Sequence, residues 1–126
     1  MFGPKSLKIA LLGIGIVVVI LGTIVEIKTG VFFSASPEYV VSMTEGAFVP
    51  ENLEIPVGGI VRFVNSDGKP RWPASNLHPT HGIYPEFDPQ RVVTPGESWG
   101  FKFKKPGIWR YHDHLHPAIR GVITVK

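Results

Sequence analysis

The sequence predicts an all-β domain, most simply a small sandwich or a Greek-key barrel, behind an apolar N-terminal segment. From residue 38 onward, short runs alternate apolar and polar side chains, as half-buried strands do. Prolines at positions 50, 56, 95 and 106 fall between these runs, where turns would place them. Outside the apolar segment, no long stretch has the periodicity of a helix.

The apolar segment is the run IALLGIGIVVVILGTIV over residues 9–25, which contains no charge. Leu7 and the stem of Lys8 extend it to a length that can cross a bilayer as a helix. A cleaved signal peptide has a shorter apolar core, and Pro37 disfavours cleavage at the small residues before it. Lys5 and Lys8 precede the run, so the positive-inside rule places the domain on the extracytoplasmic side. The expected organisation is residues 1–28, cytoplasmic stub and transmembrane anchor; 29–37, tether; and 38–126, β domain.

Several segments of the domain have strand character, either through β-branched side chains or through strict alternation. The clearest alternation places three aromatic side chains, Trp99, Phe101 and Phe103, on one face. Glycine pairs and Pro-Gly steps separate the segments and predict the turns. The expected strands lie within residues 39–43, 53–55, 60–65, 99–103, 108–112 and 121–126.

One stretch does not fit the strand pattern, the proline-rich segment between residues 65 and 91. A loop of that length inside a compact domain is usually functional or disordered. Its large apolar side chains favour an ordered loop, because side chains of this kind are expected to pack over another part of the domain. We expect an ordered loop folded over one end of the barrel. These side chains are Trp72, Leu77, Ile83, Tyr84 and Phe87.

Charge and composition exclude several classes of function. The formal net charge is +3, but much of it flanks the apolar run. From residue 29 onward the sequence has ten basic and nine acidic residues, and no basic run occurs. We therefore expect no nucleic-acid partner. The absence of cysteine excludes disulfides, thiolate metal sites and cysteine nucleophiles.

All five histidines fall in two short motifs. His78 and His81 lie in H-P-T-H on the long loop, and His112, His114 and His116 lie in Y-H-D-H-L-H at the end of a predicted strand. Residues two apart on a strand share a face, so His112 and His114 can present two nitrogens to one ion. The proline in H-P-T-H stiffens a turn that can bring the other pair together. Neutral imidazole suits copper, zinc, iron or nickel, and the pattern predicts a site with three or four ligands.

Clustered histidines can also serve purposes that need no defined metal site. A lone histidine on a strand is usually a surface residue or a satisfied hydrogen-bond partner. Histidine-rich tracts serve as loose metal scavengers or as pH switches near about pH 6. A pH switch, however, would not need the surrounding tryptophan and prolines, so we favour the metal site.

Most of residues 38–126 resembles the cupredoxins. FVPENLEIPVGGIVRFVNSD is similar to the opening strand pair of that family and its Asn-x-Asp turn. PGESWGFKFKKPGIWRYHD is similar to the strand pair that leads to the metal, and LHPAIRGVITV to the ligand loop and last strand. The resemblance implies a cupredoxin-like Greek-key β-sandwich or barrel, and copper as the cofactor.

The resemblance does not extend to the blue-copper ligands. Family members of that kind carry Cys, then His three residues on, then Met three further on; here these are Asp113, His116 and Ile119. The family's other histidine ligand, which lies upstream, would fall near Arg71 or Trp72 in this chain, and neither side chain can bind a metal. Without a thiolate, neither intense blue colour nor tuned electron transfer is expected. Y-H-D-H is instead similar to the H-x-H motifs with which multicopper oxidases hold copper.

The two resemblances favour different ligands, Asp113 with His116 or His112 with His114. Strand parity places Asp113 on the inward, aromatic face with Tyr111, and His112 and His114 on the opposite face. A buried carboxylate is costly unless it is paired or metal-bound. Asp113 is therefore a ligand or a hydrogen-bond partner that orients a histidine, and we favour the second. The outer histidines then need the long loop to fold over their face.

The sequence therefore predicts a membrane-anchored, extracytoplasmic copper-binding protein with a thiolate-free, type-2-like site that holds or delivers copper or performs redox chemistry. Histidine ligands do not choose between copper and zinc, although Cu(II) binds more strongly to a given site. The expected partners are the metal ion and the membrane. The predicted metal residues are His78, His81, His112 and His114, with His116 as an alternative and Asp113 in support.

Two alternatives come from other classes of function. The first is a small mononuclear copper oxidoreductase, for which Glu86, Asp88 or Asp113 would be the acid/base residue. The second is an interaction module that has kept the fold and lost the metal. We expect a metal-binding protein rather than an enzyme.

Overall fold

The computed structural model describes residues 16–20, 23–27, 30 and 35–126. The chain divides into two compact units, Met1–Ser34 and Ala35–Lys126. In the first unit, β1 (Ile16–Ile20) pairs antiparallel with β2 (Thr23–Ile27). The rest of the predicted anchor lies outside the described residues, so the transmembrane helix stays a prediction. In the described ranges, we find no helix with the length and apolar character needed to cross a membrane.

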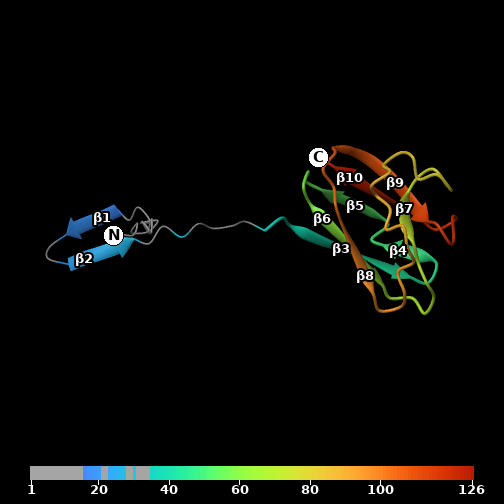
Figure 1. Cartoon of the computed structure of the whole chain (residues 1–126), viewed down its shortest axis with the longest axis horizontal. Coiled ribbons are helices and arrows are strands. Elements are labelled where there is room, and N and C mark those ends of the chain that lie inside the picture. The colour runs from blue at the N-terminus through green and yellow to red at the C-terminus, as the bar shows by residue number, and fades with distance from the viewer. Residues whose placement is uncertain (1–15, 21–22, 28–29, 31–34) are drawn as a thin grey trace, which may run out of the picture. The chain divides into compact units, whose positions relative to one another are not determined.

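The second unit is a sandwich of two four-stranded sheets, as the alternating pattern predicted (Figure 1). One sheet, called here the β3 sheet, has the order β4-β3-β6-β8, and the other, the β9 sheet, has the order β5-β10-β9-β7. The strands are β3 (Glu38–Thr44), β4 (Ala47–Val49), β5 (Asn52–Ile55), β6 (Ile60–Asn65), β7 (Pro73–Ser75), β8 (Ser98–Lys102), β9 (Gly107–Asp113) and β10 (Arg120–Val125).

The short strands β4 and β7 are additions to the predicted set. β7 lies inside the proline-rich stretch for which the sequence predicts loop throughout, and it forms the edge of the β9 sheet. It pairs antiparallel with β9, Ala74 opposite His112. Pro73 is the first residue of an edge strand, a place that tolerates a missing N–H group. All three residues of β7 are buried, so the alternation that marks a half-buried strand is absent.

The core lies between the two sheets and includes side chains from the long loop. Phe103 of the predicted aromatic face is fully buried, and Trp99 and Phe101 pack against the core, which confirms that face. From the loop, Tyr84 and Phe87 are 2 % and 0 % exposed. Aromatic rings are large apolar groups, so burying these two stabilises the loop in place. Leu77 and Ile83, which the sequence also predicts to cover the fold, are instead exposed.

Backbone and hydroxyl hydrogen bonds hold the loop against β7. The amide of Ser75 donates to the carbonyl of Phe87 (2.9 Å), and its hydroxyl contacts the carbonyls of His81 (2.8 Å) and Tyr84 (2.9 Å). The amide of Ile83 donates to the carbonyl of Asn76 (2.9 Å). The loop that follows β7, yellow in Figure 1, is therefore attached to the end of the β9 sheet where the histidines lie.

The start of the domain and the histidines lie at opposite ends of the sandwich. β3 begins at Glu38, which pairs with Ile60, and Ile60 pairs in turn with Lys102, the last residue of β8. A short turn then leads into β9, whose far end carries His112 and Asp113. At about 3.3 Å per residue, β9 separates the two ends by roughly 20 Å.

Candidate metal centre

Four histidines from two segments converge beside the end of β9. His78, His81, His112 and His114 each offer a ring nitrogen, and these nitrogens all lie within 4.8 Å of one another. His78 Nδ1 is 3.2 Å from His112 Nε2, and His81 Nε2 is 3.0 Å from His114 Nδ1. A metal ion bound at about 2.0–2.1 Å holds neighbouring ligand nitrogens about 3 Å apart. Two of the nitrogen separations therefore match the spacing of ligands on one ion, and the cluster could hold one.

Strand geometry places two of these side chains. His112 lies in β9 between Tyr111 and Asp113, and its side chain is on the face opposite the core. The loop covers it, so His112 is only 2 % exposed. His114 follows β9 directly; its amide donates to the carbonyl of Trp72 (2.8 Å), and its ring lies 4.7 Å from the indole of Trp72. The expected covering of the outer face by the loop is thus what brings the two motifs together.

The loop places the other two. The amide of His81 donates to the carbonyl of Leu77 (2.6 Å), which closes a turn around H-P-T-H. His81 has a left-handed backbone, with φ 55, that side-chain-bearing residues adopt only at a cost. That conformation directs a histidine with 4 % exposure into the cluster, whereas His78 is exposed to solvent.

Neighbouring side chains fix the ring orientation of two of the histidines. The Nδ1–H of His81 donates to Asp88 (2.6 Å), which also accepts from the indole of Trp72 (2.8 Å). His112 Nδ1 lies 3.0 Å from the amide oxygen of Asn76, to which it donates. In both rings the proton is then on Nδ1, so the lone pair of Nε2 faces the cluster. This is the usual arrangement around metal-binding histidines.

The electrostatics disfavour protonation of His112 and His114. Burial lowers the pKa of His112 to about 4, and repulsion from the neighbouring imidazoles acts in the same direction. Burial and the same neighbours lower the pKa of His114. Burial works to raise the pKa of Asp88, but hydrogen bonds from His81, Gln90 and Trp72 outweigh it and hold that pKa below its usual range. Neutral imidazoles beside an ionised carboxylate are the state that binds a cation.

Asp113 does not join the cluster and does not orient any of its four histidines. Its carboxylate is fully buried and paired with the guanidinium of Arg71, which is also fully buried. It also accepts from the amide of Leu115 (2.8 Å). Arg71 in turn donates to the carbonyl of Thr44 (2.5 Å). The orienting role that we favoured for Asp113 is carried out by Asp88 and Asn76, because Asp113 faces the core and a buried carboxylate pairs with the nearest cation.

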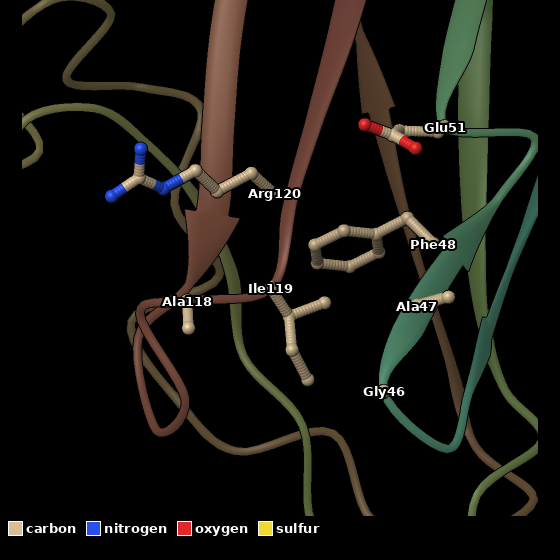
Figure 2. A pocket seen from close by; sticks show the side chains of 7 residues that line it. All are labelled: Gly46, Ala47, Phe48, Glu51, Ala118, Ile119 and Arg120. Atoms are coloured by element: carbon tan, nitrogen blue, oxygen red, sulfur yellow. The ribbon is translucent and has the colours of Figure 1, made fainter.

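His116 lies outside the cluster. Its side chain is 46 % exposed and its Nδ1 is 3.8 Å from Asp113, so it contacts the buried ion pair rather than the other histidines. Nearby, a cavity of about 290 Å³ lies beside the β9–β10 loop. Figure 2 shows the ring of Phe48 directed towards Ile119, the carboxylate of Glu51 extending above that ring, and the guanidinium of Arg120 pointing away. None of the four clustered histidines lines this cavity.

The residues that sequence reasoning missed are Asn76 and the supporting role of Asp88. The sequence suggests Asp88 only as an acid/base residue, although its position seven residues after His81 in a proline-rich loop is compatible with contact. No pattern in the sequence points to Asn76, since its contact with His112 joins positions 36 residues apart.

Comparisons with known proteins agree with this fold. Residues 14–125 match the family model of the cupredoxin-like domain, and the chain belongs to that family. A reduced amicyanin mutant is similar in structure, with TM-score 0.63 and 21 % identity over 74 % of this chain and 86 % of that one. A purple cupredoxin from Nitrosopumilus maritimus has TM-score 0.57 and 24 % identity over 69 % of this chain and 98 % of that one. No curated protein matches the chain. At these identities the structural likeness shows the fold alone.

Proposed function

We propose that this chain is a membrane-anchored, extracytoplasmic copper-binding protein whose thiolate-free site consists of His78, His81, His112 and His114. The observation that carries the proposal is the convergence of four imidazole nitrogens within 4.8 Å, drawn from two segments that only folding brings together. Imidazole is a donor for both copper and zinc, and the Irving–Williams order together with the fold family favours copper. A site without thiolate is suited to holding or delivering the ion, or to limited redox chemistry.

The acidic residues around the site favour holding over catalysis. Asp113 is paired with Arg71, and Asp88 is bound by His81 and Trp72. Glu86 lies 3.6 Å from the amino group of Lys105. An oxidoreductase needs a group that is free to move protons at the reacting centre. Each candidate for that role is already engaged, so we rank the mononuclear oxidoreductase second.

The proposed anchoring of the domain can be tested on the full chain. The chain enters the domain at Glu38, about one strand length from the histidine end. If residues 9–25 cross the bilayer as proposed, the whole domain, residues 38–126, lies in the extracytoplasmic space. Protease protection and labelling of single introduced cysteines in the full chain, in oriented membranes, would test this arrangement. Labelling of the domain from the cytoplasmic side would contradict it.

The metal itself can be tested directly. We expect the purified full chain to contain one copper per chain by elemental analysis and, as Cu(II), to give an EPR spectrum of a nitrogen-ligated type-2 site. A silent spectrum with one zinc per chain would overturn the copper assignment while retaining the site. No uptake of copper or zinc would support the metal-free interaction module instead.

A further inference from the structure

We infer that His78 is the replaceable member of the four-histidine site, the position that a nitrogen donor from outside the chain can take, while His81, His112 and His114 form a fixed frame. The inference rests on the proposed function and specifies how that site exchanges its ion. It depends on a difference in support among four residues of the same type.

His81 is held at both its backbone and its ring. Its amide donates to the carbonyl of Leu77 (2.6 Å), and its carbonyl accepts from the hydroxyl of Ser75 (2.8 Å). Its Nδ1–H donates to Asp88 (2.6 Å), and Asp88 is itself held by the indole of Trp72 (2.8 Å). Moving His81 away from the cluster would break each of these contacts, and at 4 % exposure it has little open space to enter.

His112 and His114 are fixed by the β9 sheet and by Trp72. His112 is paired with Arg120 on one side and with Ala74 on the other, and its ring is bound to Asn76. His114 is attached through its amide to Trp72, against which its ring also packs. Neither side chain can leave the cluster without disturbing the end of the sheet.

His78 lacks comparable support. In the described part of the chain, its one hydrogen-bonding contact is with the ring of His112, a member of the cluster itself. It lies in an exposed turn beside Leu77, which is 63 % exposed. A ligand held only by the site is the one that competition removes at the lowest cost, and its exposed side is where another donor can approach. The fitting donor is a neutral imidazole, either free or on a partner's histidine, because it reproduces the nitrogen that it replaces.

The test compares His78→Gly with His81→Gly in the full chain purified in detergent. Glycine leaves space for free imidazole in both variants and tolerates the left-handed backbone of residue 81. Cu(II) affinity is measured by chelator competition, with and without imidazole at a concentration too low to strip the wild-type protein. EPR reports the number of nitrogen ligands, and far-UV circular dichroism checks that both variants fold.

For His78→Gly we expect one copper per chain, an affinity loss no larger than the about 10–100-fold typical of lost supporting residues, and recovery of the wild-type EPR spectrum on adding imidazole. For His81→Gly we expect a larger loss that imidazole does not repair, because the vacated position is enclosed. Equal losses in the two folded variants, or rescue of His81→Gly alone, would overturn the inference while leaving a working copper site. Failure of the wild-type chain to bind copper would overturn the proposed function and the inference with it.

Discussion

Two adjacent residues of β9 lead to two different kinds of polar site. His112 turns away from the core and meets three other histidines under the long loop, where burial and repulsion lower the pKa of His112 and of His114. Asp113 turns inward and is neutralised by Arg71 in a fully buried ion pair. Both side chains are almost completely removed from water, with 2 % and 0 % exposure.

The two sites differ in how the free-energy cost of burying polar side chains is offset. In the inner site the carboxylate of Asp113 is already paired with a cation, the guanidinium of Arg71. The outer site brings four imidazole nitrogens within 4.8 Å of one another. Such a cluster could hold a metal ion. Asp113, at the position of the blue-copper cysteine, thus forms an ion pair with Arg71. The candidate metal site lies on the other face of the same strand.

The largest expected effect is on metal binding when the outer site loses two ligands. His112→Ala/His114→Ala should lower Cu(II) affinity by more than about 1000-fold, well beyond the 10–100-fold typical of lost supporting residues. Isothermal titration with a competing chelator measures this. His116→Ala is the matched control, since it removes a histidine of the same motif that lies outside the cluster. Equal losses in both variants would place the ligands elsewhere.

The inner site should govern stability rather than metal binding. Asp113→Ala removes the carboxylate bound to Nε of the buried Arg71 and leaves it the more distant Asp67 (3.5 Å), so it should lower the free energy of unfolding by about 3 kcal/mol. Urea denaturation measures the change. The exposed ion pair between Arg62 and Glu38 is the control, and Glu38→Ala should leave the free energy of unfolding almost unchanged because water screens the pair.

If Asp113 instead contributes to the metal site, copper affinity will fall in the folded fraction of Asp113→Ala. A milder variant, Asp113→Asn, keeps the shape of the side chain and allows the same titration if the alanine variant is too unstable. We expect unchanged copper stoichiometry in both.

A smaller effect should come from the support of His81. Asp88→Asn removes the negative charge behind the ring while keeping the shape of the side chain, and should lower copper affinity about 10–100-fold with folding unchanged. Glu86→Gln is the control, because it removes a carboxylate from the same loop whose contact is an exposed ion pair with Lys105. Indistinguishable affinities for the two variants would show that Asp88 does not act through His81.

The smallest effect concerns the pH dependence of the metal-free protein. The pKa of His112 is about 4 in the folded chain, below its ordinary value of 6.5, so between these values the unfolded chain takes up a proton that the folded chain does not. The free energy of unfolding should therefore fall as pH drops from 6.5 towards 4, and this group should contribute no pH dependence above that window. Urea denaturation with a chelator present measures the slope, which should flatten in His112→Ala/His114→Ala. A slope that is the same in both proteins would contradict the shift.

Local pattern was enough to predict the sandwich, its main strands and the separation of inward and outward faces on β9. Alternation of aromatic and polar residues is a local property, and burial of Phe103 follows from it directly. The short strands were missed because they carry no such alternation: β7 is buried at all three positions. Which loop side chains enter the core was also not readable, since Tyr84 and Leu77 look equally apolar in sequence but are 2 % and 63 % exposed.

For the site, the sequence specified which residues carry chemistry: histidines in two motifs, no thiolate, and an aspartate inward of them. Parity along one strand is set by the covalent chain, so the opposite orientations of His112 and Asp113 could be derived from spacing. The partners could not, because each is fixed by a contact between distant positions. Arg71 reaches Asp113, Asp88 reaches His81, and Asn76 reaches His112 only after the loop has packed against β7 and β9. Folding therefore assigned the carboxylates their roles, and it left His78 as the least supported of the four histidines.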